Sequence, residues 1–194
     1  MNNENYEYSN RRSLSRSQRL LKKQLQVREF RSWSLCVGVA VLSALLIRAF
    51  IFSIVLVDGM SMYPTLNPGE RVAMEKISRY IDLPQYGEII IVEYPDVDDE
   101  CIKRTIGLPG DTIEVRDGQL YRNGTMIKED YLNPDPYPDW GPYTVPDDTV
   151  FVMGDNRVRS LDSRSDKIGV IPRDKIDGHA LLVIWPFDNI RRLE

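Results

Sequence analysis

Residues 33–57 read WSLCVGVAVLSALLIRAFIFSIVLV, a stretch of 25 residues with a single charge, Arg48. As a helix this stretch would be about 37 Å long, whereas the hydrocarbon layer of a bilayer is about 30 Å thick. A helix therefore does not need the whole stretch, and the β-branched and aromatic residues after Arg48 indicate that its end continues as a strand. We expect a transmembrane anchor over residues 33–52, with the Arg48 side chain reaching water at the far interface.

The segments on the two sides of this stretch differ in charge. Residues 1–32 carry eight Lys/Arg and three Asp/Glu, whereas residues 33–194 carry 17 and 26. Because basic segments stay in the cytoplasm, we expect a cytoplasmic basic tail over residues 1–32 and an extracytoplasmic domain over residues 53–194 of a single-pass cell-membrane protein. The alternatives are a buried core helix and a cleaved signal peptide. The long basic segment and the lack of a small-x-small site argue against cleavage.

The segment after the anchor contains short apolar or alternating runs between turn signals. Such runs predict strands, here over residues 88–94, 112–115, 119–121, 125–127, 149–153 and 180–185. Asp117-Gly118 and Asn123-Gly124 are typical of hairpin turns, since both pairs tolerate positive φ. We expect a short helix over residues 72–81 and a loop or edge strand in the proline-rich residues 130–146. The predicted fold class is mostly β, a mixed antiparallel β domain with one N-terminal transmembrane helix.

The composition limits the chemistry of the domain. The chain has one histidine, His179, and two cysteines, Cys36 in the anchor and Cys101 in the outer domain. These are too few for a zinc site of ordinary spacing, and they indicate no disulfide framework. The outer domain is acidic and lacks basic patches interleaved with aromatic residues, so nucleic-acid binding is not supported. We expect no metal and no cofactor.

Two motifs suggest a serine nucleophile served by a lysine base. Ser61 lies in Val57-Asp-Gly-Met-Ser-Met-Tyr-Pro-Thr-Leu66, and Lys103 lies in Cys101-Ile-Lys-Arg-Thr-Ile-Gly-Leu-Pro-Gly-Asp111. A Ser–Lys pair is a known variant of the Ser–His–Asp arrangement. Lysine accepts a proton only when it is neutral, so burial must lower its pKa from about 10.4. The alternative interpretation is a solvated turn serine and a solvated strand lysine.

A third motif follows the strand predicted over residues 149–153. It reads Met153-Gly-Asp-Asn-Arg-Val-Arg-Ser-Leu-Asp-Ser-Arg-Ser165. In one interpretation it is a tight turn followed by solvated charges. In the other, the turn carries Ser160 to the lysine amine as an orienting hydrogen-bond partner, while Asp162 and Arg164 brace the loop. The residues of this motif alone do not distinguish the two interpretations.

Together with Tyr86-Gly-Glu-Ile-Ile90, the three motifs resemble in order and spacing those of the type I signal peptidases, the membrane-anchored Ser/Lys proteases of bacteria. The short interval between Asp111 and Thr149 resembles that of the compact Gram-positive members. The resemblance implies a signal-peptidase-like β fold with Ser61 as nucleophile and Lys103 as general base. It also implies supporting roles for the third motif: Ser160 orients the lysine, Asp162 and Arg164 form a structural pair, and Asp155, Asn156 and Arg157 shape the turn.

The resemblance further implies a substrate and a location. The expected reaction is removal of signal peptides from secretory preproteins through an acyl-enzyme, at membrane lipid and near the export translocon. Cleavage sites of the Ala-x-Ala kind imply shallow pockets for small side chains before the cut. The candidates to line these pockets by position are Val55, Val57, Met62, Leu66 and Ile102.

Two positions depart from the family pattern. Gly59 stands where some members have a hydroxyl that helps to bind the oxyanion, so the Ser61 backbone amide needs another donor in the Gly59 region. Val158-Arg159 stands where more polar residues are common, and the sequence indicates no role for it. The alternative function is a catalytically inactive membrane-anchored homologue that acts as a binding or accessory protein, which would require a disabled dyad.

Overall fold

The computed structural model describes residues 28–48, 50–94, 97–132 and 137–193. The chain divides between Ile47 and Arg48 into a helical unit and a β-rich unit. The helix Arg28–Arg48 has 21 residues and, within the described residues, is the one helix long and apolar enough to cross a membrane. It starts before residue 33, because helix formation depends on backbone propensity as well as hydrophobicity. Residues 1–27 of the predicted basic tail lie outside the described residues.

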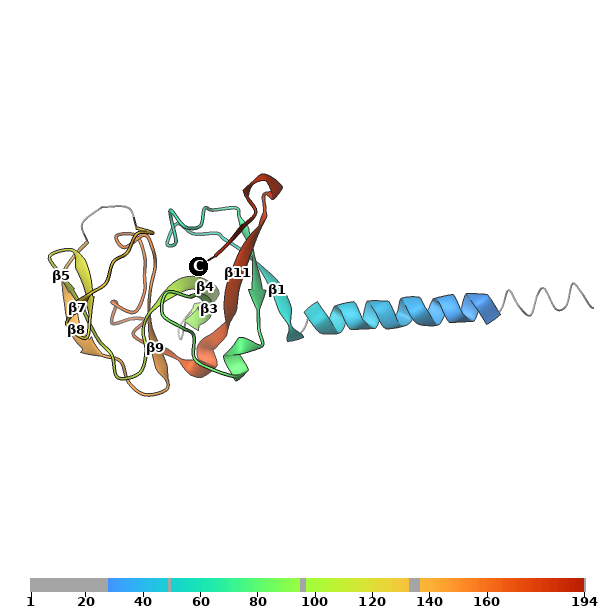
Figure 1. The fold of residues 1–194 in the computed structure, drawn as a ribbon, viewed down its shortest axis with the longest axis horizontal. Helices are drawn as coiled ribbons and strands as arrows, with labels where there is room; N and C mark the ends of the chain where they lie inside the picture. Colours follow the sequence, from blue (N-terminus) through green and yellow to red (C-terminus); the bar gives the residue numbers. More distant parts are fainter. Residues whose placement is uncertain (1–27, 49, 95–96, 133–136, 194) are drawn as a thin grey trace, which may run out of the picture. The chain divides into compact units, whose positions relative to one another are not determined.

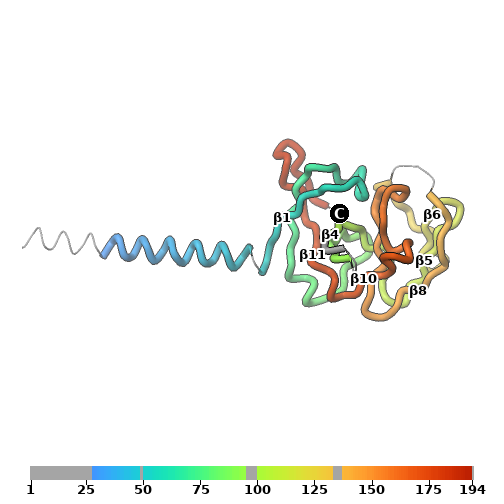
Figure 2. The backbone as a smooth tube through the Cα atoms, turned by 180° about the vertical axis from the view of Figure 1, so that it is seen from behind, coloured from blue at the N-terminus to red at the C-terminus, as the bar shows by residue number. Residues whose placement is uncertain are grey.

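Within the described residues, twelve strands form two antiparallel sheets (Figure 1). The larger sheet has the order β1-β2-β11-β3-β4-β9-β10, with β12 beside β11, and the smaller sheet has the order β7-β6-β5-β8. The strands are β1 (Phe52–Leu56), β2 (Arg71–Glu75), β3 (Ile89–Tyr94), β4 (Val97–Gly107), β5 (Thr112–Arg116), β6 (Gln119–Arg122), β7 (Thr125–Met126), β8 (Trp140–Thr144), β9 (Thr149–Met153), β10 (Ile171–Pro172), β11 (Ile176–Trp185) and β12 (Arg191–Arg192). In the β-rich unit the smaller sheet lies on the side away from β1 and β11, as the view from behind also shows (Figure 2).

Strand β3 lies at the centre of the larger sheet because its sequence is a continuous apolar run. It pairs with β11 on one side and with β4 on the other, and Ile90, Ile91 and Val92 are each fully buried. Alternate residues of β3 belong to two different core clusters, one on each face of the sheet. A third cluster, around Phe151, lies between β9 and the smaller sheet.

Most strand predictions are confirmed. Each of the six predicted runs overlaps an observed strand, β3, β5, β6, β7, β9 or β11. The two predicted hairpin turns are also confirmed, since Asp117 and Gly118 have φ of 53° and 69° and Asn123 and Gly124 have φ of 55° and 76°. The proline-rich segment contributes β8, an edge strand in which Pro142 is accommodated. Residues 133–136 of this segment lie outside the described residues.

The helix predicted over residues 72–81 is wrong. Residues Arg71–Glu75 form strand β2, and only Ser78–Tyr80 forms a turn of 3-10 helix, η1. Val72 and Met74 are fully buried while Arg71 is exposed. This alternation has the period of a strand, and β2 is held from both sides by β1 and β11. Tertiary pairing therefore outweighs the local helical propensity of Ala73, Met74 and Glu75.

Candidate active site

Ser61 lies in a turn that follows edge strand β1. Two apolar side chains of this turn are buried in the core. Met62 and Leu66, at 1% and 0% exposure, belong to the core cluster under the larger sheet, and the Leu66 amide donates to the Met62 carbonyl over 2.9 Å. The Ser61 carbonyl accepts a hydrogen bond of 2.9 Å from the Asn156 amide. The turn is thus attached to the core on one side and to the third sequence motif on the other, while the Ser61 side chain remains partly accessible.

Lys103 lies on β4, opposite Ile90 of β3. Its Nζ donates to Ser61 Oγ over 3.0 Å and to the Ile102 carbonyl over 3.0 Å. The residue is only 3% exposed. Two residues that are 42 positions apart in the chain, Ser61 and Lys103, are therefore joined by a direct hydrogen bond.

Burial lowers the pKa of Lys103 from its ordinary value of 10.5. The charges of Cys101, Asp162 and Asp155 act in the opposite direction but do not cancel the effect of burial. The ring centroid of Tyr94 lies 5.7 Å from Nζ and forms part of the enclosing wall. The environment therefore favours the neutral amine, the form that can accept a proton.

The third motif forms a loop after β9 that lies against the Ser61 turn. A Cβ atom at Gly154 would overlap both Ser160 Oγ and the Ser61 carbonyl, so only glycine permits this close approach. Ser160 Oγ is buried and has no hydrogen-bond partner among the described residues. The loop thus brings Ser160 close to the Ser61 backbone. The predicted hydrogen bond between Ser160 and Lys103 is not made in this structure, and the orienting role stays a prediction.

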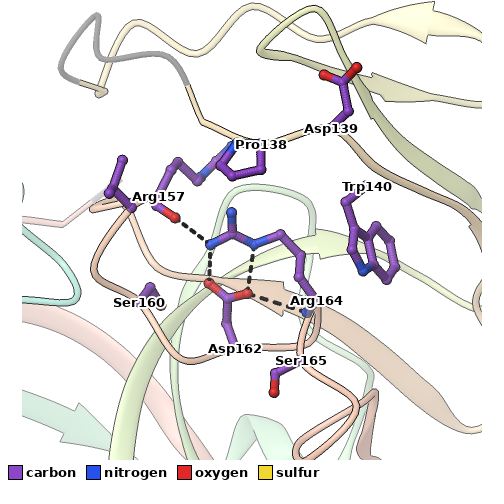
Figure 3. Close-up of a pocket in the computed structure, with 9 residues that line it drawn as sticks. Pro138, Asp139, Trp140, Arg157, Ser160, Asp162, Arg164 and Ser165 are labelled. Carbon is purple, nitrogen blue, oxygen red and sulfur yellow. Dashed lines mark hydrogen bonds and ion pairs between the residues drawn. The ribbon is translucent and has the colours of Figure 1, made fainter.

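Asp162 and Arg164 form a bidentate ion pair that braces the same loop (Figure 3). Arg164 Nε and Nη2 donate to the Asp162 carboxylate over 2.8 and 2.9 Å, and Nη2 also donates to the Arg157 carbonyl over 2.7 Å. Asp162 further accepts from the Gly154 amide over 3.0 Å. Burial alone would raise the pKa of Asp162, but the Arg164 contacts and the Gly154 amide hold it below its ordinary value.

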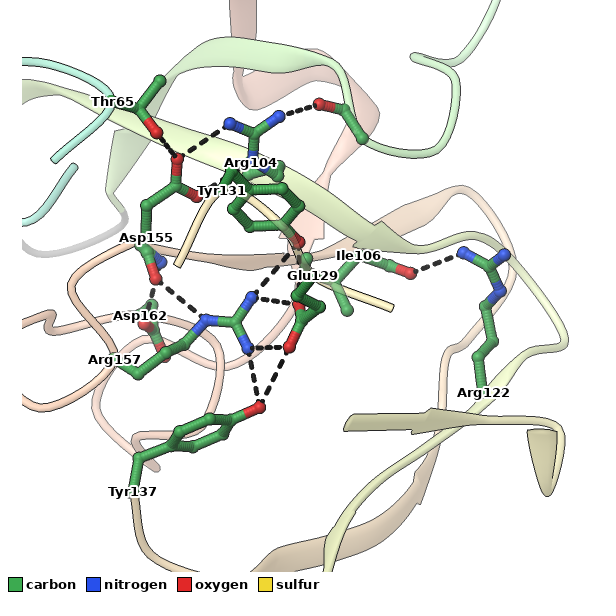
Figure 4. A network of polar contacts seen from close by, with 12 residues as sticks. Thr65, Arg104, Ile106, Arg122, Glu129, Tyr131, Tyr137, Asp155, Arg157 and Asp162 are labelled. Atoms are coloured by element: carbon green, nitrogen blue, oxygen red, sulfur yellow. Dashed lines mark hydrogen bonds and ion pairs between the residues drawn. The ribbon is translucent and has the colours of Figure 1, made fainter. Parts of the chain in front are cut away.

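Asp155 joins the loop to both dyad segments (Figure 4). Its carboxylate accepts from Arg104 Nε over 2.9 Å and from Arg104 Nη2 over 2.8 Å, in an ion pair whose side chains are 0% and 3% exposed. The same carboxylate accepts from the Thr65 hydroxyl. Because Arg104 follows Lys103 and Thr65 belongs to the Ser61 turn, this cluster connects the two segments that carry the dyad.

Arg157 connects the loop to the segment between β7 and β8 of the smaller sheet. Its guanidinium pairs with the Glu129 carboxylate, with one hydrogen bond of 2.9 Å, and also donates to the Tyr137 hydroxyl over 2.9 Å (Figure 4). Its Nε donates to the Gly154 carbonyl over 3.1 Å. Arg157 and Glu129 side chains are 3% and 7% exposed, so the ion pair is almost completely buried.

A groove of about 790 Å³ runs along β1 and β4 to the dyad. We call it the entry groove, and it is lined by Ile54, Val55, Leu56, Val57, Asp58, Gly59, Ser61, Met62, Glu100, Cys101, Ile102 and Lys103. Four of the five predicted pocket residues, Val55, Val57, Met62 and Ile102, therefore line it. Leu66 does not line it and is fully buried in the core, because the Ser61 turn needs an apolar anchor there.

The sequence model of the family described as signal peptidase, peptidase S26, matches residues 30–185. The chain belongs to this family of signal peptidases. A signal peptidase I of Bacillus licheniformis is 41% identical over 172 residues, which cover 84% of this chain and 92% of the relative. Signal peptidase I S of Bacillus subtilis is 42% identical over 171 residues, or 82% of this chain and 91% of the relative. The chain is accordingly a type I signal peptidase, and we refer to it below as the peptidase.

A solved structure of a signal peptidase I from Enterococcus faecalis is also similar. It is 37% identical and covers 51% of this chain and 97% of its own, with a TM-score of 0.45.

Sequence reasoning missed two residues that hold the peptidase site together, Tyr94 and Glu129. The Tyr94 ring lies beside Lys103, and its hydroxyl donates to the Leu161 carbonyl over 2.7 Å. Glu129 is the buried counter-charge of Arg157. Neither residue belongs to a motif. For Glu129 the one possible signal was Arg157 of the third motif, because a buried arginine needs a carboxylate partner from elsewhere in the chain.

The other candidate groups of the peptidase lie apart from Ser61. His179 on β11 pairs through Nδ1 with Glu88 over 3.2 Å, so this histidine is not the partner of the serine. Among the described residues, no group of three or more His, Cys, Asp or Glu side chains could hold a metal ion. Within the same residues the Ser61 amide donates to no acceptor, and a Cβ atom at Gly59 would meet only that amide nitrogen, at 4.0 Å. The region beside Gly59 is therefore open.

Proposed function

We propose that the peptidase removes signal peptides from exported preproteins with Ser61 as nucleophile and Lys103 as general base. The observation that carries the proposal is the hydrogen bond of 3.0 Å from Lys103 Nζ to Ser61 Oγ at a buried amine. A nucleophile and a base within 2.6–3.2 Å of each other meet the geometric requirement for nucleophilic catalysis. The lowered pKa of Lys103 supplies the second requirement, a neutral amine.

The reaction proceeds in two stages. Ser61 Oγ attacks the scissile carbonyl carbon while its proton passes to Lys103 Nζ, and the resulting ammonium then protonates the leaving amine of the mature protein. The C–N bond breaks and an ester to Ser61 remains. In the second stage Lys103 takes a proton from water, the hydroxide attacks the ester, and the proton returns to Ser61 Oγ as the signal peptide leaves.

The Ser61 amide is the proposed oxyanion donor. Its N–H has no acceptor among the described residues, and it lies beside the open region at Gly59, where a water molecule can supply the second donor. Donors of this kind stabilise the transition state by about 3–4 kcal/mol each. The Asp155–Arg104 and Asp162–Arg164 pairs hold the surrounding segments and do not touch the reacting atoms.

The entry groove binds the residues before the cut in this proposal. Val55, Val57, Met62 and Ile102 are buried apolar side chains in the lining of this groove, which suits small apolar side chains such as those of an Ala-x-Ala site. Preproteins that end their signal peptides in this way are the proposed substrates.

The helix Arg28–Arg48 is the proposed single-pass anchor, with the basic segment before it in the cytoplasm and the β-rich unit outside. Because β1 begins at Phe52, soon after the helix, only a short stretch of chain separates Ser61 from the proposed anchor. A signal peptide in the same bilayer is then captured at high effective concentration near the export translocon.

The test is cleavage of a preprotein with an Ala-x-Ala site by the purified full chain and its variants. We expect Ser61→Ala and Lys103→Ala to lose activity by at least about 10²–10⁴-fold, the usual contribution of a general base. His179→Ala is the control and should remain close to wild type, because its imidazole is engaged with Glu88. An unchanged melting temperature would show that the inactive variants are folded. Retained activity in Lys103→Ala would contradict the proposed Ser61–Lys103 dyad. If the wild-type chain did not cleave the preprotein, the accessory-protein alternative would be favoured.

A further inference from the structure

A second depression also borders the Ser61 turn and contains Val158-Arg159, to which the sequence assigned no role. It has a volume of about 510 Å³. We call it the exit groove, and it is lined by Met60, Tyr63, Asp155, Asn156, Arg157, Val158 and Arg159. None of the residues that line the entry groove is among them.

The two grooves flank the nucleophile. Met60 of the exit groove directly precedes Ser61, and the Asn156 amide donates to the Ser61 carbonyl over 2.9 Å. Met62, the residue after Ser61, lines the entry groove together with Lys103. A peptide bond held at Ser61 Oγ with its preceding residues in the entry groove therefore has the exit groove as a neighbouring depression for the residues that follow, and this depression is lined by two residues of the Ser61 turn, Met60 and Tyr63.

Arg159 is the charged residue of the exit groove that can form an ion pair with a bound ligand. Asp155 and Arg157 also line the groove, but each is neutralised by a buried partner, Arg104 and Glu129. Arg159 is exposed, and no carboxylate of the described residues lies within ion-pair distance of its guanidinium. Its amide donates to Asn156 Oδ1 over 3.2 Å, and its Nη1 lies 4.0 Å from Met60 Sδ.

The two grooves differ in the sign of the charged side chains that line them. The entry groove carries the exposed carboxylates of Asp58 and Glu100 at its rim, whereas the exit groove carries Arg159. Beside this cation, Val158 and Met60 present apolar surface and are 61% and 44% exposed. A site of this composition fits a short peptide segment that combines apolar side chains with a carboxylate.

We propose that the exit groove binds the first residues of the mature protein, and that Arg159 makes the peptidase prefer an acidic side chain there. The inference rests on the proposed function, since it takes the entry groove as the site for the residues before the cut. Arg159 is then a specificity-determining residue that contacts the substrate but not the reacting atoms.

The test compares three preproteins that share one signal peptide and differ only at the second residue after the cut, which is Glu, Gln or Lys. For the purified full chain at low ionic strength we expect kcat/KM to be about fivefold higher for the Glu substrate than for the Lys substrate, as exposed ion pairs allow. Arg159→Glu should reverse this order, and Arg159→Gln should remove it. High salt should weaken the preference of the wild-type chain, because exposed charges are screened.

The matched control is Lys167→Glu, which makes the same change in net charge at an exposed residue that lines neither groove. It should keep the wild-type order of substrates. Lys167→Glu should also cleave the Gln substrate at the wild-type rate, which separates a loss of substrate preference from a general loss of catalysis. An order of Glu, Gln and Lys substrates that is the same in Arg159→Glu as in wild type would overturn the inference while leaving the proposed function standing. Failure of the wild-type chain to cleave any of the three would overturn the proposed function itself.

Discussion

At the scale of single residues, the behaviour of the site depends on how far Lys103 is removed from water. A lysine on a strand is ordinarily charged, but this one is 3% exposed, faces a tyrosine ring and donates to the Ser61 hydroxyl. The nearby carboxylates of Asp155 and Asp162 would stabilise an ammonium, yet both are occupied by arginines. Burial therefore dominates, and the amine is favoured in its neutral form.

This state of Lys103 predicts how activity depends on pH. Since the base must be neutral, kcat/KM for preprotein cleavage should rise with pH and level off below 10.5, the ordinary pKa of lysine. A pH–rate profile of the purified chain measures this. A rising limb with its midpoint at or above 10.5 would contradict the assignment of Lys103 as a buried base.

The same shift links Lys103 to stability. Between the lowered pKa of the folded protein and 10.5, the unfolded chain binds a proton that the folded chain does not, so stability rises with pH across this window and is lost as pH falls. Lys103→Met removes this contribution. The melting temperature of the variant relative to wild type should therefore be highest at low pH and decline through the window, whereas Lys167→Met, an exposed control, should show no such trend.

At the scale of elements, the site is assembled by ion pairs that tie separate segments to the loop after β9. Asp155 reaches β4 through Arg104 and the Ser61 turn through Thr65, and Arg157 reaches the segment after β7 through Glu129. Gly154 allows the loop to approach the Ser61 backbone. Because each pair is buried, loss of one partner leaves an uncompensated charge in the interior.

Removal of Glu129 should therefore destabilise the protein strongly. Glu129→Ala leaves the Arg157 guanidinium buried without its counter-charge, at a cost of about 3–5 kcal/mol. For a protein of this size the cost corresponds to a fall of about 10 °C in melting temperature. Glu129→Gln keeps hydrogen-bonding groups and should lose less.

The matched control is Glu114→Ala, which breaks the exposed pair with Arg116, whose side chains are 30% and 51% exposed. Exposed pairs contribute little to stability because solvent screens them, so the melting temperature of this variant should change little. Thermal unfolding of the detergent-solubilised chains measures the difference. Equal small changes in Glu129→Ala and Glu114→Ala would show that the Arg157 pair is not needed to hold the loop.

At the scale of the whole molecule, a basic segment, an apolar helix and an acidic β-rich unit follow one another along the chain. The helix has the length and composition of a membrane span, and the net charge on its two sides has opposite sign. The proposed arrangement places the dyad outside the cell, where exported preproteins emerge.

This arrangement predicts the accessibility of the two chain ends. In intact cells, a tag at the C-terminus should react with a membrane-impermeant antibody or label, whereas a tag at the N-terminus should react only after permeabilisation. Replacing the Lys/Arg residues of segment 1–32 with Gln should weaken this orientation. An N-terminal tag that is accessible in intact cells would contradict the proposed topology.

The sequence by itself determined the apolar helix, the mostly β class and the hairpin turns, and its motifs predicted the Ser61–Lys103 pair that we propose as the dyad. These features are local, since they depend on hydrophobic runs, on residues that tolerate positive φ and on short motifs. Strand β2 was misassigned because its state depends on pairing with β1 and β11 rather than on its own propensity.

Only the tertiary structure decided which distant residues surround the dyad. Leu66 belongs to a motif yet lies in the core, and Glu129 and Tyr94 belong to no motif yet hold the loop and enclose the lysine. Segments far away in the chain determine how deeply a side chain is buried and which groups it contacts. The lowered pKa of Lys103 and the two grooves beside Ser61 therefore follow from tertiary packing. Short motifs predict the proposed reacting groups, whereas the protonation and the surroundings of these groups depend on the assembled sheets.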